Sequence, residues 1–186
     1  MTIQHNLITG SDLHEPKGVA AAANKTVYVA NGSGSGVWTA PNAVANVYIA
    51  FNSSSPGYTQ ANTTSDVILD PTWVSAIISD FTVQTSPNAR LRYDGTDIKN
   101  VNITLAMACN QASGSNKDVE FALFKNGTEI AGSRSIRTTT TSDWGNITVI
   151  GSTTMTTNDY IEVKSKTSAS ATIQYASLSL RVLGAV

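Results

Sequence analysis

The residues of this sequence that could carry out catalysis are few, and they do not form a recognisable constellation. His5 and His14 are the only histidines, and no spacing typical of a metal site joins them. Cys109 is the only cysteine, and it lies on the apolar phase of its segment. That position predicts a buried, unreactive thiol that forms no disulfide within the chain. These residues predict neither a nucleophile with its base nor a metal centre, and we expect no cofactor.

Acidic residues lie close together in the sequence at two places, Asp94 with Asp97 and Asp159 with Glu162. Both pairs fall in segments typical of turns, where solvated carboxylates are commoner than an acid–base pair. Asp94, Asp97 or Asp118 could ligate calcium in a loop, but nothing resembles an EF-hand loop. The sequence therefore predicts that the protein is not an enzyme.

A glycine-serine run at residues 31–36 has the composition of a phosphate-binding loop. A phosphate loop needs a strand before it, a helix after it and a Gly-Lys-Ser/Thr ending. Val37 and Trp38 follow this run instead. The run therefore predicts a hinge between two parts of the chain.

Three tryptophans, Trp38, Trp73 and Trp144, could provide stacking platforms for sugars. Trp144 is the best candidate, because residues 142–145 have the composition of an exposed loop. We favour the alternative, in which Trp144 anchors its loop by packing against the body of the protein.

Net charge and composition exclude several classes of partner. The net charge is −1 and charged residues make up 13% of the chain, about half of the usual ~25%. The sequence therefore shows no basic patch of the kind that binds nucleic acid or an anionic membrane surface. No apolar run approaches the ~20 residues that a membrane span needs. We expect a protein that is made in a cytoplasm, has no membrane insertion and stays soluble until it meets a partner.

The elements that must position these residues are strands. Residues 98–109 alternate, with Ile103, Leu105 and Met107 on one face and Asn102 on the other, which is typical of a half-buried antiparallel strand. Asn126-Gly127 is a strong hairpin signal. Regular strand spacing without a long helix predicts an all-β fold, an antiparallel jelly-roll sandwich of about ten strands. The expected strands are residues 47–51, 63–69, 73–78, 81–83, 90–93, 98–109, 119–125, 128–133, 147–155, 160–166 and 172–183.

The last expected strand has apolar residues on two phases. Ile173 and Tyr175 share one phase, while Leu178, Leu180 and Val182 share the other. Either a bulge near residues 176–177 shifts the register, or both faces are covered because the strand lies in a subunit interface. We favour the interface.

The sequence divides into an N-terminal segment, residues 1–42, and a jelly-roll domain, residues 43–186. The N-terminal segment has too few apolar residues to bury a core of its own. It includes the glycine-serine hinge and an expected strand at residues 26–30. We expect this segment to attach the protein to a partner and the second part to fold and trimerise.

Three motifs and the closing apolar strand resemble the jelly roll of the tumour-necrosis-factor and complement-globular-head family, in particular its versions in bacteriophage virion proteins. The motifs are Tyr93-Asp-Gly-Thr, Lys125-Asn-Gly-Thr and Asn158-Asp-Tyr-Ile-Glu-Val. The resemblance implies a homotrimer in which the last two strands face the threefold axis. The interface residues that we expect from it are Tyr160, Tyr175 and Leu178.

A second resemblance concerns the N-terminal segment. Residues 12–18 and 27–38 are similar to the N-terminal segment of small phage structural proteins. This similarity implies attachment to other virion proteins, of capsid or tail, through Leu13, His14, Pro16, Gly18, Tyr28 and Trp38.

Together the two resemblances imply a trimeric virion structural protein of the capsid decoration or head-fibre type. The alternative that they leave open is a tail-tip or fibre-tip adsorption protein. That protein would bind a host surface glycan, with Trp144 as the contact.

Overall fold

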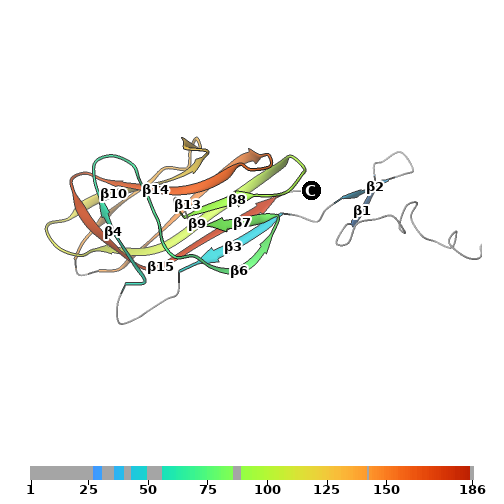
Figure 1. Cartoon of the computed structure of the whole chain (residues 1–186). Helices are drawn as coiled ribbons and strands as arrows, with labels where there is room; N and C mark the ends of the chain where they lie inside the picture. Colours follow the sequence, from blue (N-terminus) through green and yellow to red (C-terminus); the bar gives the residue numbers. More distant parts are fainter. Residues whose placement is uncertain are drawn as a thin grey trace, which may run out of the picture. The chain divides into compact units, whose positions relative to one another are not determined.

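The structure of the protein is a computed structural model that describes residues 27–30, 36–39, 43–49, 56–85, 89–141 and 143–184. Backbone contacts divide the chain into two compact units, Met1–Pro41 and Asn42–Val186. In the first unit, β1 (Val27–Ala30) pairs antiparallel with β2 (Gly36–Thr39). The short helical turn that residues 19–23 could form lies outside the described residues. All secondary structure in the described residues is strand (Figure 1).

The described residues of the second unit form thirteen strands in two sheets. The β9–β15 sheet has the order β13-β9-β15-β3-β6, and β4 also pairs with β15. Its strands are β3 (Val44–Tyr48), β4 (Tyr58–Asn62), β6 (Val74–Ser79), β9 (Lys99–Gln111), β13 (Gly145–Met155) and β15 (Ala171–Gly184).

The β10–β14 sheet has the order β11-β10-β14-β8-β7, with β12 also pairing with β10 and β5 with β14. Its strands are β5 (Val67–Ile68), β7 (Phe81–Gln84), β8 (Arg90–Tyr93), β10 (Lys117–Lys125), β11 (Thr128–Glu129), β12 (Ser135–Thr139) and β14 (Tyr160–Thr167).

Strands that follow one another in the sequence mostly lie in opposite sheets. The chain crosses from β8 to β9, from β9 to β10, from β12 to β13 and twice more before it ends in β15. All pairings are antiparallel, and the core lies between the two sheets. This arrangement is a jelly roll, so the predicted fold class is confirmed.

Strand β9 follows the predicted alternation. Ile103, Leu105 and Met107 are at most 2% exposed and face the core, whereas Asn102 and Thr104 are exposed. In the register of β9 with its two neighbours, Leu105 lies opposite Val149 of β13 and Leu180 of β15, which are both apolar. The strand is therefore buried on one face only.

The final strand corrects one prediction. The register of β15 against β9 shifts between Tyr175 and Ser177, so Ala176 is the extra residue of a bulge. Because of the bulge, Tyr175 on one side and Leu178 on the other both point into the core, where they are 0% and 1% exposed. The two apolar phases therefore serve a single core, and the interface that we favoured does not explain them.

Several predicted strand limits also change. Two short polar strands, β4 and β12, are not predicted, because their residues YTQAN and SIRTT show no apolar alternation. The run expected at residues 63–69 contains only β5, and the first sandwich strand begins at Val44. Residues 86–88, whose sequence Ser-Pro-Asn is typical of a turn, lie outside the described residues.

The predicted Asn126-Gly127 hairpin is present. Lys125 pairs with Thr128, and the two turn residues have φ values of 50° and 80°. Positive φ at both central residues defines the turn type whose twist matches that of the flanking strands, and glycine adopts it without steric cost. The second arm, β11, is shorter than predicted, because the chain turns again at Gly132, φ 77°.

The alternation of β9 leads to a stability prediction. Leu105→Ala removes a fully buried side chain from the middle of the core and should cost about 2–5 kcal/mol of unfolding free energy. Asn102→Ala, on the exposed face, should cost far less. Chemical denaturation of the two variants measures both values, and equal losses would contradict this register.

Candidate functional site

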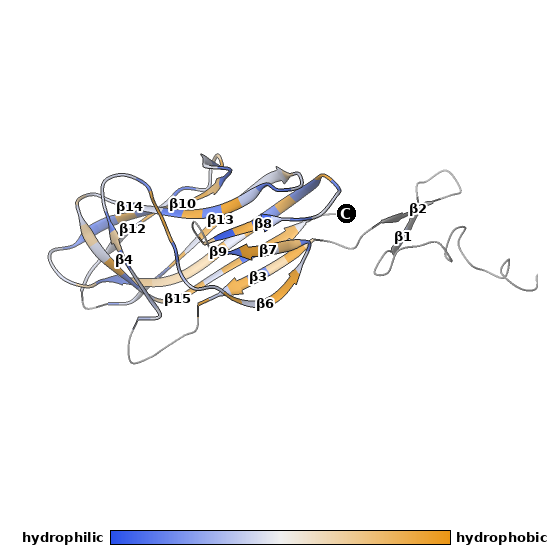
Figure 2. Cartoon of the chain, viewed as in Figure 1, coloured by the Kyte–Doolittle hydropathy of each residue, from blue (hydrophilic) through white to orange (hydrophobic). Residues whose placement is uncertain are grey.

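The two sheets differ in charge. The six strands of the β9–β15 sheet contain two charged residues, Lys99 and Arg181, whereas the seven strands of the β10–β14 sheet contain eleven. Lys99 is 5% exposed, so Arg181 is the only charged side chain that these six strands present to solvent. Figure 2 shows the same contrast, since β3 and β6 are pale to orange while β10 and β14 carry blue segments.

Small polar residues cover the middle of the outer face of the β9–β15 sheet. Hydroxyl and amide side chains bond to one another across strands, as Ser152 Oγ does to Asn102 Oδ1 at 2.9 Å and Thr154 Oγ1 to Asn100 Oδ1 at 2.8 Å. These groups use one another as partners, so the face is only weakly polar, and Arg181 on β15 is its single charge among the six strands. We call it the uncharged face.

Large apolar side chains lie at both side margins of the uncharged face. At the margin formed by β3 and β6, Tyr48 is 38% exposed, Val74 39% and Ile77 60%, and Tyr48 lies directly opposite Val74. At the other margin, on β13, Ile150 is 65% exposed. We call these the β6 margin (Tyr48, Val74, Ile77) and the β13 margin (Ile150).

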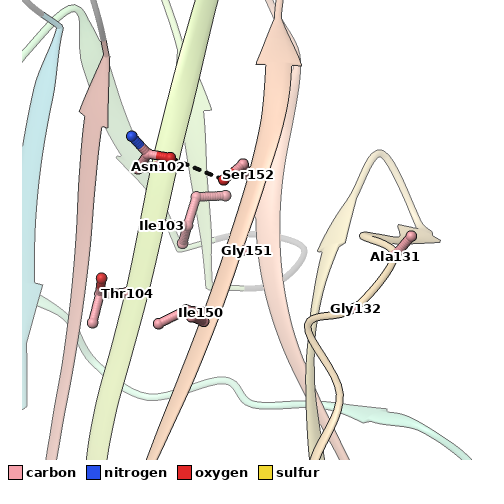
Figure 3. A pocket seen from close by; sticks show the side chains of 8 residues that line it. All are labelled: Asn102, Ile103, Thr104, Ala131, Gly132, Ile150, Gly151 and Ser152. Atoms are coloured by element: carbon pink, nitrogen blue, oxygen red, sulfur yellow. Dashed lines mark hydrogen bonds between the residues drawn. The ribbon is translucent and has the colours of Figure 1, made fainter.

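The β13 margin also contains a shallow pocket of about 480 Å³ beside Ile150 (Figure 3). Strands β9 and β13 form one part of it, and the chain after β11 forms the other, at Ala131 and Gly132. The figure shows the bond between Ser152 and Asn102 at its upper end. The residues that line it are Asn102, Ile103, Thr104, Ala131, Gly132, Ile150, Gly151 and Ser152.

Strand β13 is an edge strand. It pairs with β9 over all eleven residues, and no other strand among the described residues pairs with its second side. Its sequence, GNITVIGSTTM, contains no charge and no proline. Charged side chains of neighbouring strands bond to two of its carbonyl oxygens, Arg137 Nη1 to Asn146 at 3.0 Å and Lys125 Nζ to Thr154 at 2.9 Å. The edge between these two residues has no such cover, and another surface could protect it.

The outer face of the β10–β14 sheet is charged, but its charges neutralise one another. Arg134 lies within 3.1 Å of Asp66 and Glu120 and 2.6 Å from Glu129, and Lys166 lies 3.1 Å from Glu120. Hydrogen bonds to Glu129 and Asp66 raise the pKa of Arg134 above its ordinary value. In this network each of these charged side chains has a partner of opposite charge.

The two acid pairs form ion pairs and hydrogen bonds within the fold, and the expectation of solvated turn carboxylates is wrong for Glu162, which lies in β14. Thr82 and Arg92 donate hydrogen bonds to Asp94 at 2.5 and 2.7 Å. Glu162 is buried, with Arg90 at 2.6 Å and Lys164 at 3.7 Å. Among the residues that the structure describes, no three histidine, cysteine or acidic side chains are grouped to hold a metal ion.

Asp159 fixes the turn before β14. Burial acts to raise the pKa of its carboxyl group, but hydrogen bonds from the Thr156 N–H, the Asn126 amide and the Lys125 ammonium outweigh it, and the pKa is lowered. The ionised carboxylate is therefore part of the folded structure rather than a proton donor.

Cys109 is fully buried, as its sequence position predicts. Burial raises the pKa of its thiol to about 11, because the thiolate loses its hydration, while the positive charge of Arg137 acts weakly in the opposite direction. The thiol is thus inert at neutral pH.

The residues predicted for the trimer interface are not brought together at the surface. Tyr175 and Leu178 lie in the core, as the bulge requires, so a second copy of the chain cannot contact their side chains. Tyr160 lies on the outer face of the charged sheet, 4.2 Å below the Arg90 guanidinium. Sequence reasoning missed Ile150, which is 65% exposed on the uncharged face, while its neighbour Val149 occupies the buried phase of β13.

The residues predicted for attachment lie in the first unit. Leu13, His14, Pro16 and Gly18 are outside the described residues. Tyr28 is 36% exposed on β1, where it is the cross-strand partner of Trp38. The predicted glycan contact Trp144, in the second unit, is 45% exposed in the segment before β13.

The described residues contain no helix that is long and apolar enough to cross a bilayer.

Comparison with known proteins finds similarity in structure alone. No family model matches the chain, and no curated protein sequence does. Among solved structures, murine APRIL at pH 5.0 is 11% identical, with a TM-score of 0.48 over 78% of this chain and 100% of that one. The Eiger TNF of S. frugiperda is 10% identical, with a TM-score of 0.46 over 78% of this chain and 94% of that one. At this level the similarity carries no argument about function.

The lowered pKa of Asp159 predicts a pH dependence of stability. A carboxyl group whose pKa falls on folding stabilises the protein above its unfolded pKa, and the contribution is lost as pH falls through the folded value. Asp159→Asn should therefore lower the unfolding free energy at neutral pH, and its difference from the unaltered protein should shrink below about pH 4. Urea denaturation across pH tests this, with the exposed Asp143→Asn as a control that should change little.

Proposed function

We propose that the protein is a non-enzymatic structural protein of a bacteriophage particle. In this proposal it works as a homotrimer of the capsid decoration or head-fibre type. The jelly roll forms the trimer and projects from the particle, and residues 1–42 attach it to other virion proteins.

The uncharged face is the observation that supports assembly into a homotrimer. A sheet face exposed to water normally carries charged side chains, as the β10–β14 sheet does here. The β9–β15 sheet presents only Arg181, together with exposed aliphatic and aromatic side chains at both margins. Protein interfaces are poor in charge and rich in such side chains, which supports contact with further copies of the chain.

The positions of the apolar residues favour a ring over a two-fold dimer. The β6 margin and the β13 margin lie on opposite sides of the sheet, because β6 and β13 are its two end strands. If the β13 margin of one protomer packs on the β6 margin of the next, each protomer uses two different patches. Such a head-to-tail contact forms a closed ring when the rotation closes. The same contact covers the open edge of β13.

Attachment to a phage particle rests on sequence resemblance. The N-terminal segment is similar to that of small phage structural proteins, and the motifs around Tyr93, Lys125 and Asn158 resemble phage versions of the jelly roll. The separate compact unit at Met1–Pro41 agrees with a division of labour between attachment and assembly.

The second candidate is an adsorption protein at a tail tip or fibre tip that binds a host surface glycan. The exposed indole of Trp144 favours it, since aromatic faces stack on sugars. Copy number separates the two candidates. A decoration protein is present in many copies per particle and a tip protein in few, so quantitative mass spectrometry of purified particles discriminates between them.

The ring arrangement predicts which substitutions prevent assembly. Ile77→Asp and Ile150→Asp each place a charge in one margin and should convert the trimer to monomer, because a buried, unpaired carboxylate is costly. Ile136→Asp is the matched control. Ile136 is 63% exposed, but it lies on β12 of the charged sheet, and its substitution should leave the trimer intact. Analytical ultracentrifugation measures all three.

Mixing the two variants distinguishes a head-to-tail contact from a two-fold contact. The Ile77→Asp variant retains its β13 margin, and the Ile150→Asp variant retains its β6 margin. An equimolar mixture should therefore form a dimer containing one chain of each kind. A stable monomer of the unaltered protein would refute the assembly, and a trimer that survives both substitutions would refute these margins.

The division of labour predicts the effect of a deletion. A protein that begins at Ala43 should remain a folded trimer, but it should fail to bind particles that lack the native copy. Electron microscopy of particles incubated with the full and shortened chains measures binding. If the shortened chain binds as well as the full one, attachment lies on the jelly roll instead.

A further inference from the structure

A second cavity lies at the end of the jelly roll far from the point where the chain enters it. The chain enters at Ala43, whose carbonyl oxygen accepts a hydrogen bond from the Gly184 N–H at 2.8 Å, at the end of β15. The cavity lies at the beginning of the same strand, at Ala171 and Thr172. Strand β15 has 14 residues, so the two points are about 40 Å apart.

The cavity has the volume and lining of a polar ligand site. It measures about 650 Å³, within the range of small-molecule sites. Hydroxyl and amide side chains predominate in the lining, with Lys117 as the only charged group and no carboxylate among them. A lining without acids does not suit a metal cation, whereas hydroxyls and amides can both donate to and accept from the hydroxyls of a sugar.

One wall of the cavity is fixed before any ligand binds. Gln111 is 2% exposed, and its Nε2 donates hydrogen bonds to the carbonyl oxygens of Ser113 and Ser115, the latter at 3.0 Å. Gly114 has a φ of +93°, a conformation that glycine adopts readily. The Ala112 N–H donates to the Thr172 carbonyl oxygen at 2.9 Å, which ties this loop to β15. A preformed wall lowers the entropy cost of binding.

Lys117 gives the cavity a positive charge. Its ammonium donates to Ser115 Oγ at 2.9 Å, and no carboxylate of the described residues lies within ion-pair distance of it. Most other cations of the jelly roll, such as Lys166 and Arg134, are paired with acids. A carboxylate of a ligand would complete the coordination of Lys117.

We propose that this cavity binds an acidic saccharide, such as a uronic-acid unit of a surface polysaccharide. Its carboxylate is held by Lys117, and its hydroxyls are held by the side chains around the cavity. Gln111 acts as a positioning residue, because it shapes the loop at residues 113–115. This inference rests on the adsorption candidate above, for which it names the class of ligand and its site.

Saccharide binding by the full chain tests the proposal. The probes are D-glucuronate and D-glucose, which differ only in a carboxylate and a hydroxymethyl group, and saturation-transfer NMR reports their binding at millimolar concentration. Glucuronate should bind about tenfold more tightly than glucose, as expected for one charge-assisted contact. Lys117→Met should remove this preference, and the control Lys166→Met should retain it.

A blocking variant locates the site. Ala61 is exposed and lines the cavity, so Ala61→Trp fills the space without disturbing the core, and it should abolish binding of both sugars. Three results would each overturn the proposal. They are binding of neither sugar, equal binding of the two sugars, and binding that survives Ala61→Trp. The readout does not depend on assembly, so loss of the trimer in ultracentrifugation and loss of saccharide binding are separate failures.

Discussion

The pairing of β9 with β15 is the constraint on which the rest of the structure depends. These two strands lie in the middle of one sheet and stay in register from Val101 with Gly184 to Gln111 with Ile173, apart from the bulge at Ala176. Because side chains alternate along a strand, the register that turns Leu105 and Leu180 inward also fixes what points outward. A single pairing thus specifies both the core and the uncharged face.

The bulge at Ala176 allows β15 to contribute to the core on both sides of it. Without an extra residue, the β15 segment that contains Tyr175 and the segment that contains Leu178 would point to opposite faces. With Ala176 inserted, both segments contribute to one core, and β15 continues far enough to join Ala43 at one end and the polar cavity at the other. The distance between Ala43 and the polar cavity is therefore set by the length of β15.

The parts of the fold that follow from local pattern could be predicted from the sequence. The alternation of β9 and the Asn126-Gly127 turn are local signals, and the structure has both. The bulge could be named only as one of two alternatives, since an apolar side chain looks the same in a core and in an interface. Strands β4 and β12 could not be predicted, because they are polar and show no apolar alternation. Each is a strand through its pairing with a neighbour, β4 with β15 and β12 with β10. The uncharged face depends on strands up to 139 residues apart, as Val44 and Leu183 are, so no window of sequence displays it.

The open edge of β13 has a consequence for the protein before assembly. Alternate residues of β13 turn their backbone N–H and carbonyl groups away from β9. Arg137 and Lys125 donate to the carbonyl oxygens of Asn146 and Thr154, so the open part of the edge lies between these two residues, and it contains no charge or proline of its own. A single protomer thus exposes a short template for strand addition, and the hazard grows with protein concentration. In the proposed ring the next protomer covers the same stretch, so assembly and amyloid-like association would compete for it.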